Sequence, residues 1–225
     1  FTDIAFSLFG RAVGGPAKAA VVGSSLFGML SGSSVANVMT TGTITIPLMK
    51  QVGYRPVVAG AIEACSSTAG MFTPPLMGAT AFVVAAFLGE SYLRIIGAAA
   101  LPALCYYVAV FAFVDFEARK MGIKPLEGHE LPVLRNVLKE GFHLVVPIIL
   151  LVAFLVAGYT ASLACFWAIV GLFGISFLKK SSRLSGIDLM KVFEMAGRAT
   201  VSVSLACAAA GIIVSATTLS GLGLR

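Results

Sequence analysis

The chain has 225 residues, of which 58% are hydrophobic even without glycine and 12% are charged, and its mean hydropathy is +0.97. Soluble domains carry about 25% charged residues, so this composition excludes a water-soluble globule, and its high apolar content excludes a disordered chain. We therefore predict an all-α polytopic membrane protein, whose length allows about five to seven crossings of about 20 residues each. The net charge is +6, and in a membrane protein the basic residues mark the cytoplasmic side.

Several classes of site are not supported by the residue pattern. The four cysteines are far apart in apolar segments and form no CxxC or Cys/His group, which argues against zinc and against a disulfide framework. The two histidines, His129 and His143, lie outside the hydroxyl-rich segments, so no Ser/His/Asp arrangement suits catalysis. The chain starts at Phe1 and ends at Arg225 directly after an apolar segment, and we expect a fragment of a longer polytopic chain.

The first apolar segments are unusual in length. Residues 1–10 have the pattern of a helix end, and residues 17–30 and 35–49 are apolar halves that Ser31-Gly-Ser-Ser34 separates. Each half would be about 21–23 Å long as a helix, too short for a hydrocarbon core of about 30 Å, whereas the two halves together are too long. Either a re-entrant hairpin or one broken, over-long crossing fits this pattern.

Flanking charge favours the hairpin. Arg11 and Lys18 lie at the start of the unit, and Lys50 and Arg55 lie at its end. No acidic residue occurs between Arg11 and Arg55. Because basic residues stay on the cytoplasmic side, both ends of the unit are predicted to lie there. We therefore predict a re-entrant hairpin over residues 17–49.

The remaining segments follow the same rule. We predict a crossing over 57–88 broken at Thr73-Pro-Pro75, a span over 92–114, a cytoplasmic amphipathic connection over 115–141, and spans over 142–157, 161–178 and 200–224. Three connections on one side, 50–55, 115–141 and 179–198, then hold 12 of the 16 basic residues, which agrees with the positive-inside rule.

Both predicted breaks are rich in hydroxyl groups. Lipid offers no hydrogen bonds, so a broken helix at membrane depth must line a cavity or be buried in protein. A break exposes carbonyl groups at the end of one half-helix, which suit Na⁺, and N–H groups at the start of the next, which suit a carboxylate. We therefore predict a binding site at the two breaks. Glu63 lies in the apolar zone, where it serves either as an ion or proton group or as a buried structural partner.

These residues carry a resemblance to a known family. The segments Phe27-GMLSGSSVA-Asn37, Thr41-GTITIPLM-Lys50, Gly53-YR-Pro56, Ser66-STA-Gly70 and Pro74-Pro75 resemble the large membrane subunit of TRAP (tripartite ATP-independent periplasmic) transporters. The sequence around Asn37 and Thr40-Thr-Gly42 is similar to fused permeases that work with TAXI-type binding proteins.

The resemblance implies a sodium-coupled, elevator-type secondary importer of small organic acids in the bacterial inner membrane. Its partners would be a periplasmic binding protein of TAXI type and a small membrane subunit or fused N-terminal segment. The fold would consist of two inverted repeats, each with a re-entrant hairpin and a broken helix. Residues 1–114 would form the transport unit of the first repeat, and residues 142–225 would be the start of an incomplete second repeat. By this analogy Na⁺ would be held by Ser31, Gly32, Ser33, Ser34, Ser67, Thr68 and Gly70. The substrate would contact Ser34, Asn37, Thr41, Thr73, Pro74 and Pro75.

Three other functions remain open from the residues. A dicarboxylate/sodium symporter without a binding protein would share the hairpin architecture. The permease of an ATP-driven importer would need a coupling helix, which residues 131–138 could imitate. An intramembrane hydrolase could use Ser33 or Ser34, although no base lies near either serine in the sequence.

Overall fold

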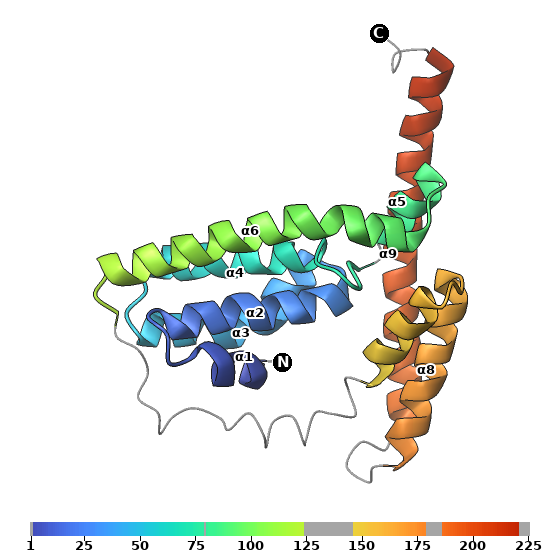
Figure 1. Ribbon diagram of the computed structural model, residues 1–225. Helices are drawn as coiled ribbons and strands as arrows, with labels where there is room; N and C mark the ends of the chain where they lie inside the picture. Colours follow the sequence, from blue (N-terminus) through green and yellow to red (C-terminus); the bar gives the residue numbers. More distant parts are fainter. Residues whose placement is uncertain (1, 79, 124–145, 179–185, 221–225) are drawn as a thin grey trace. The chain divides into compact units, whose positions relative to one another are not determined.

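The computed structural model describes residues 2–78, 80–123, 146–178 and 186–220, and every regular element within these ranges is an α-helix (Figure 1). This confirms the predicted all-α class. The helices are α1 (Thr2–Phe9), α2 (Gly15–Ser31), α3 (Ser34–Gln51), α4 (Pro56–Gly70), α5 (Thr80–Leu88), α6 (Tyr92–Lys120), an apolar helix at Val146–Val156, α8 (Ala161–Leu178) and α9 (Gly186–Ser220).

The chain divides into two compact units, Phe1–Ala168 and Ile169–Arg225. The first unit contains α1 to α6 and holds both segments that the sequence singles out. The second contains the end of α8 and the whole of α9. The division into two inverted repeats stays a prediction.

Helices α2 and α3 form a hairpin that packs against α4. Pro16 occupies the first turn of α2, where its missing N–H is tolerated, and Pro56 begins α4 in the same way. The core between these helices and α6 is built from small and medium apolar side chains, among them Ala17, Ala20 and Ala59, which are fully buried. Small residues let helices approach closely, which brings the ends of α2, α3 and α4 together.

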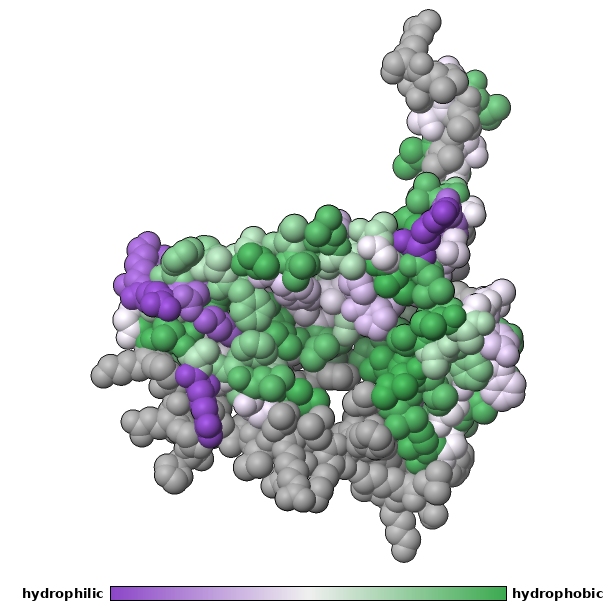
Figure 2. Space-filling view, in the orientation of Figure 1, coloured by the Kyte–Doolittle hydropathy of each residue, from purple (hydrophilic) through white to green (hydrophobic). Residues whose placement is uncertain are grey.

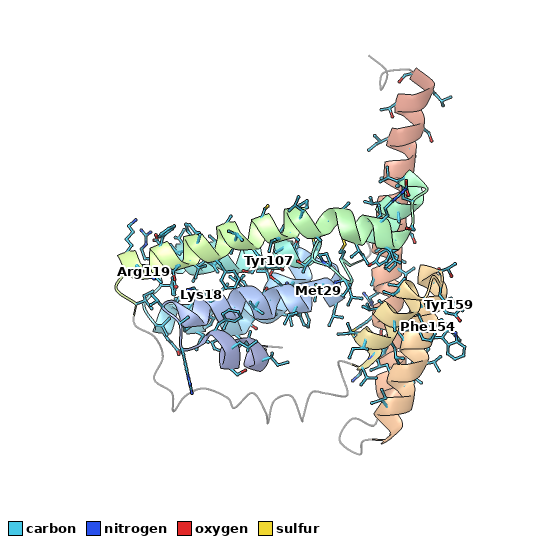
Figure 3. The ribbon with its side chains drawn as sticks, viewed as in Figure 1. Lys18, Met29, Tyr107, Arg119, Phe154 and Tyr159 are labelled. Carbon is cyan, nitrogen blue, oxygen red and sulfur yellow. The ribbon has the colours of Figure 1, made fainter. Side chains whose placement is uncertain are left out.

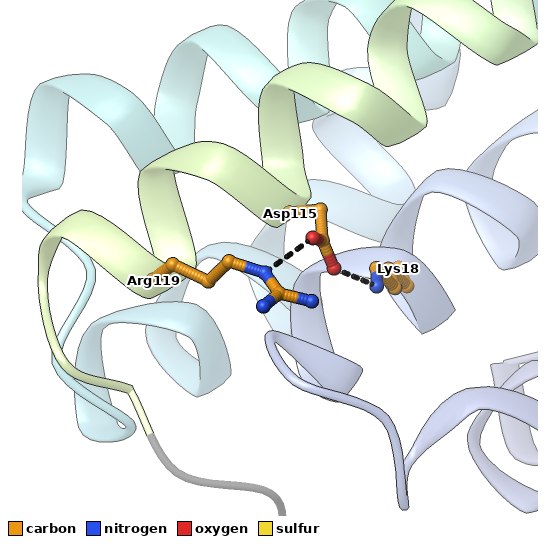
Figure 4. Close-up of polar contacts among 3 residues, drawn as sticks. All are labelled: Lys18, Asp115 and Arg119. Atoms are coloured by element: carbon orange, nitrogen blue, oxygen red, sulfur yellow. Dashed lines mark hydrogen bonds and ion pairs between the residues drawn. The ribbon is translucent and has the colours of Figure 1, made fainter.

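Ion pairs hold the base of the hairpin against α6 (Figures 3 and 4). At the start of the hairpin, Lys18 donates from Nζ to Asp115 Oδ1 at 2.5 Å, and Arg119 donates to the other oxygen of Asp115 at 2.7 Å. Just after the hairpin, Arg55 donates to Glu117 at 2.8 Å. Both ends of the hairpin therefore lie beside the last turns of α6, the arrangement that a hairpin requires and a single crossing would not allow.

Two helices are longer than their apolar segments predict. Helix α6 continues from the predicted end at 114 to Lys120, because Asp115 and Arg119 pair one turn apart and Gly122 takes the left-handed conformation (φ 67°) only afterwards. Helix α9 begins at Gly186, inside the predicted loop 179–198, and Glu194 pairs there with Arg198. The predicted amphipathic segment 131–138 and both histidines lie outside the described residues.

Two described helices have the length and apolar composition of a membrane crossing. They are Tyr92–Lys120 and Leu189–Thr217, and shorter apolar helices occupy Val146–Val156 and Ser162–Ile175. In the first unit, apolar side chains cover most of the face seen in Figure 2, and hydrophilic ones gather near the ends of α6. This distribution suits a surface that faces lipid.

Two buried tyrosines differ in how their hydroxyl groups are satisfied. Tyr54, between α3 and α4, is 2% exposed, and its phenolic oxygen has no hydrogen-bond partner in the described part of the chain. Tyr92, at the start of α6, donates to the carbonyls of Pro75 at 3.0 Å and Leu76 at 2.6 Å, which lie between α4 and α5. Burial, together with the carboxylates of Asp115 and Glu117, raises the pKa of Tyr54 to about 12.

We predict opposite effects of removing these two hydroxyls. Tyr54→Phe deletes an unsatisfied buried group and should raise the free energy of unfolding by about 1 kcal/mol, whereas Tyr92→Phe should lower it by about 1 kcal/mol.

The stability of the wild type should also depend on pH. Because unfolded tyrosine ionises near pH 10 and folded Tyr54 near 12, the free energy of unfolding should fall between these pH values, and it should fall less in Tyr54→Phe. Unfolding in detergent across that pH range measures both effects, and equal effects of the two variants would contradict the assignment.

Candidate functional site

The tip of the hairpin is a two-residue break between α2 and α3. Gly32 takes the left-handed conformation (φ 65°) and its N–H closes the end of α2 on the Gly28 carbonyl. Ser33 is extended (φ −129°, ψ 114°), and its hydroxyl caps α3 by accepting from the Ala36 N–H at 3.3 Å. Glycine after a helix and serine before one are the residues that these positions favour, so the local sequence dictates the break.

The second break follows α4. Helix α4 ends at Gly70 and α5 begins at Thr80, so a turn occupies Met71–Gly78. Two tyrosines of α6 bond this segment: Tyr107 shares a hydrogen bond of 2.6 Å with Thr73, and Tyr92 bonds the carbonyls of Pro75 and Leu76. Tyr106 donates to the Cys65 carbonyl of α4 at 3.0 Å. The predicted broken crossing is thus interrupted where the Thr-Pro-Pro sequence lies.

The two breaks lie against each other. The Gly78 N–H donates to the Met29 carbonyl at 3.2 Å, and a Cβ added to Gly78 would lie 2.5 Å from Gly32 Cα. One turn deeper, a Cβ added to Gly70 would lie 2.6 Å from Gly28 Cα. Glycine is required at these contacts because the backbone of one segment packs directly against the backbone of the other. The contacts bring the hairpin tip and the turn into one site.

The breaks leave backbone groups available to ligands. At the end of α2 the carbonyls of Leu30 and Ser31 accept no hydrogen bond within the described ranges. At the start of α3 the N–H groups of Ser34 and Val35 likewise have no acceptor among the described residues. Free carbonyls suit a cation and a free helix N-terminus suits an anion, so the tip offers groups of both kinds within a few residues.

The predicted site residues separate into two groups. The tip and the turn hold one group: Ser31, Gly32, Ser33 and Ser34 at the tip, and Thr73, Pro74 and Pro75 in the turn. Gly70 packs on Gly28 beneath the tip, and the Thr68 hydroxyl is exposed and donates to Ala64. The other group, Asn37, Thr41 and Ser67, is buried between the helices, away from the tip.

The buried group surrounds Glu63, whose side chain is fully buried. Its Oε1 accepts from Thr41 at 2.5 Å, from Ser24 at 2.8 Å and from Ser67 at 3.2 Å, and its Oε2 accepts from Thr45 at 2.6 Å. We call these five residues the Glu63 cluster. It joins α2, α3 and α4 at one level.

Asn37 extends the cluster toward the tip. Its side-chain amide donates to the Ser24 carbonyl at 2.7 Å, and its Oδ1 lies 3.1 Å from the Thr41 hydroxyl. Sequence reasoning missed Ser24, Thr45 and the α6 tyrosines. A signal was present for two of the helices, because Thr41 and Thr45 are four residues apart, as are Glu63 and Ser67, and such spacing places each pair on one helix face.

No resident metal centre of the transition-metal kind is formed within the described part of the chain, where no three His, Cys, Asp or Glu side chains gather. The oxygens that could hold a cation are backbone carbonyls and hydroxyls at the breaks. Hard oxygen ligands of this kind suit an alkali or alkaline-earth cation.

Within the described ranges, apolar helices of membrane length, a helical hairpin and a broken helix that meet at exposed backbone groups are features of an integral membrane protein with a ligand site at the helix breaks. The family model for the DctM component of tripartite ATP-independent periplasmic transporters matches residues 1–225, and the chain belongs to this family. Members of the family are secondary transporters and not enzymes, and they lie in the inner membrane. The predicted resemblance to the TRAP large membrane subunit is confirmed.

Curated relatives agree with this assignment. The chain is 28% identical to the C4-dicarboxylate TRAP transporter large permease protein of Pseudomonas aeruginosa over 204 residues, 88% of this chain and 46% of the relative. It is 28% identical over 152 residues to the isethionate TRAP transporter permease protein of Oleidesulfovibrio alaskensis (66% and 24%). It is 30% identical over 120 residues to the sialic acid TRAP transporter permease protein of Haemophilus influenzae (53% and 19%). The chain thus spans less than half the length of these relatives.

Proposed function

We propose that this chain forms part of a sodium-coupled secondary importer of small organic acids, in which the hairpin tip binds both Na⁺ and the substrate. A periplasmic binding protein, of TAXI type by the sequence resemblance, would deliver the substrate, and a small membrane subunit or fused segment would complete the permease. Membership of the DctM family supports a secondary transporter that works with a binding protein. The three named relatives carry isethionate, sialic acid and C4-dicarboxylates in their names, and all of these are organic acids.

The observation that carries the proposal is the pairing of free carbonyls and free N–H groups at one break. The Leu30 and Ser31 carbonyls end α2, and the Ser34 and Val35 N–H groups begin α3 after two intervening residues. We assign Na⁺ to the carbonyl side, with the hydroxyls of Ser31 and Ser33 nearby and the carbonyls at the end of α4 as further ligands. We assign the substrate carboxylate to the N–H groups of Ser34 and Val35, and the Thr73-Pro-Pro75 turn would complete its contacts.

The tip and the base of the first unit also support an elevator-type movement. The hairpin, α4 and the turn share the backbone contacts described above, so they would move as one body. Helix α6 would travel with this body, because Tyr107 and Tyr92 bond the turn and ion pairs hold the base.

Uptake by the full-length permease in proteoliposomes, with its binding protein supplied outside, tests this function. We expect an inward Na⁺ gradient to drive accumulation of an organic acid without ATP, and K⁺ in place of Na⁺ to abolish it. Uptake that requires ATP would contradict the proposal. Sodium-driven uptake that is equally fast without the binding protein would instead support a symporter of similar architecture.

A further inference from the structure

The Glu63 cluster has no part in the proposed contacts with Na⁺ or substrate, although it holds a buried acidic side chain. In the part of the chain that the structure describes, the basic residues of α2 and of the loop after α3 pair elsewhere, Lys18 with Asp115 and Arg55 with Glu117. No ion pair of Glu63 is present there. Its carboxylate is satisfied by hydroxyl groups alone, and this satisfaction depends on three helices at once.

The donors come from the helices whose ends form the site. Ser24 lies seven residues before Ser31 on α2, Thr41 lies seven after Ser34 on α3, and Ser67 lies three before Gly70 on α4. At 1.5 Å per residue the cluster is about 5–10 Å below the tip and the turn. The Glu63 cluster is therefore close enough to control the alignment of the tip and the turn, and it is too deep to contact a ligand held at the tip.

The hydrogen bonds tolerate little sliding. Oxygen pairs at 2.5–2.8 Å join Glu63 to Ser24, Thr41 and Thr45. A shift of one helix by two residues, about 3 Å along its axis, would lengthen such a pair to about 4 Å, beyond hydrogen-bond range, and would leave a buried carboxylate oxygen unsatisfied. The cluster thus selects one axial register of α2 and α3 against α4.

The same register aligns the contacts nearer the tip. Ser25 donates to the Ser66 carbonyl at 3.1 Å, Gly28 meets Gly70, and the Met29 carbonyl accepts from Gly78. Each of these contacts joins α2 to α4 or to the turn that follows it. A slip of α2 along α4 would break all of them together and separate the two halves of the site.

We propose that Glu63 is the positioning residue of the transport site: its carboxylate fixes the register of the hairpin against the broken helix, so that the tip and the turn stand together in the binding-competent geometry. This inference rests on the proposed function. The short oxygen–oxygen distances around the carboxylate suit hydroxyl hydrogens, because a cation held at about 2.4 Å from each oxygen keeps adjacent ligands roughly 3.4 Å apart.

The matched test compares two threonines of α3. Thr45 is fully buried and donates to Glu63 Oε2, whereas Thr43 is exposed and donates to the Thr40 carbonyl. In the full-length permease we expect Thr45→Val to raise the apparent KM for substrate about tenfold and to leave the maximal rate per folded transporter within about twofold. A smaller competent fraction weakens apparent affinity in proportion, whereas saturating substrate restores that fraction. Thr43→Val should have the apparent KM of the wild type. Thr45→Ser keeps the hydroxyl and should also have the wild-type KM.

A second measurement does not depend on transport. Amide hydrogen exchange at Gly78, whose N–H bonds the Met29 carbonyl, should rise about tenfold in Thr45→Val and stay unchanged in Thr43→Val. Equal KM values and equal Gly78 exchange in the two valine variants would overturn the positioning role. So would Glu63→Gln if it abolished sodium dependence while Thr45→Ser behaved normally, because the carboxylate would then carry an ion. If the wild-type protein showed no sodium-driven uptake, the proposed function would be refuted. The exchange rate of the Gly78 amide in the two valine variants would still test whether Glu63 fixes the register of the helices.

Discussion

Gly70→Ala should be among the most damaging single-methyl changes in the first unit. The added Cβ would lie 2.6 Å from Gly28 Cα, 2.7 Å from the Gly28 carbonyl carbon and 2.9 Å from the Ser25 carbonyl oxygen. All three atoms are backbone, so no side chain can turn away and α2 must move from α4. Overpacking of this kind costs about 1–3 kcal/mol. We expect the free energy of unfolding in detergent to fall by about 2 kcal/mol and uptake to fall at least tenfold.

Gly60→Ala is the matched control on the same helix. A Cβ at Gly60 meets nothing within 4 Å, and the residue lies inside α4. Alanine is favoured over glycine in a helix interior by about 1 kcal/mol, so this variant should unfold at a higher temperature and transport normally. If Gly70→Ala behaved like Gly60→Ala, the close approach of α2 and α4 would be wrong, and with it the meeting of the two breaks.

Ser34→Pro should have the second large effect, on substrate affinity and not on stability. Ser34 is the first residue of α3, where proline is tolerated, and the preceding Ser33 already has the extended backbone that proline demands of its neighbour. The substitution removes the free N–H that we assign to the substrate carboxylate. A hydrogen bond to a charged group contributes about 1.5–3 kcal/mol, so apparent affinity should fall about ten- to a hundredfold.

Ser34→Ala separates the backbone group from the side chain. It keeps the N–H and removes only the hydroxyl, so we expect affinity within about threefold of the wild type. Competition uptake in proteoliposomes measures both variants, and thermal unfolding checks that each is folded. Normal affinity in Ser34→Pro would show that the start of α3 does not bind the acid, and an equal loss in both variants would assign the contact to the hydroxyl.

The sequence contains enough information to place the hairpin and its break. Glycine and serine at 31–34 stop one helix and cap the next through local geometry alone, and the basic residues around Lys18 and Arg55 indicate that both ends of the unit lie together. Such features depend on neighbours a few residues away. They can therefore be predicted without knowledge of the packing.

The arrangement around Glu63 could not be predicted in the same way. Its partners lie 39 residues before it (Ser24), 22 and 18 residues before it (Thr41 and Thr45), and 4 after it (Ser67). Only the packing of α2 and α3 on α4 decides which hydroxyls reach the carboxylate. For the same reason Asn37 and Thr41, expected near the substrate, lie in the interior: their helix face turns toward α2 and α4, which the motif alone does not reveal.

The continuation of α6 through its charged last turn could not be predicted from the sequence for another reason. Hydropathy separates Asp115 from the apolar segment before it, yet a helix continues through charged residues when they pair one turn apart and reach a neighbour, as Asp115 does with Arg119 and Lys18. The length of an apolar segment therefore predicts which residues cross the membrane, but it does not predict the residue at which the helix ends.

The two-residue break at Gly32 and Ser33 has an electrostatic consequence for stoichiometry. Under the proposed function, a cation on one side of the break and an anion on the other would neutralise each other across a few ångströms. A hairpin that carries only one of them would expose an unbalanced charge to the hydrocarbon, at a cost of several kcal/mol. The empty and the doubly loaded forms could then cross readily, whereas the singly loaded form could not, and such a penalty would by itself prevent sodium from leaking through without its cargo.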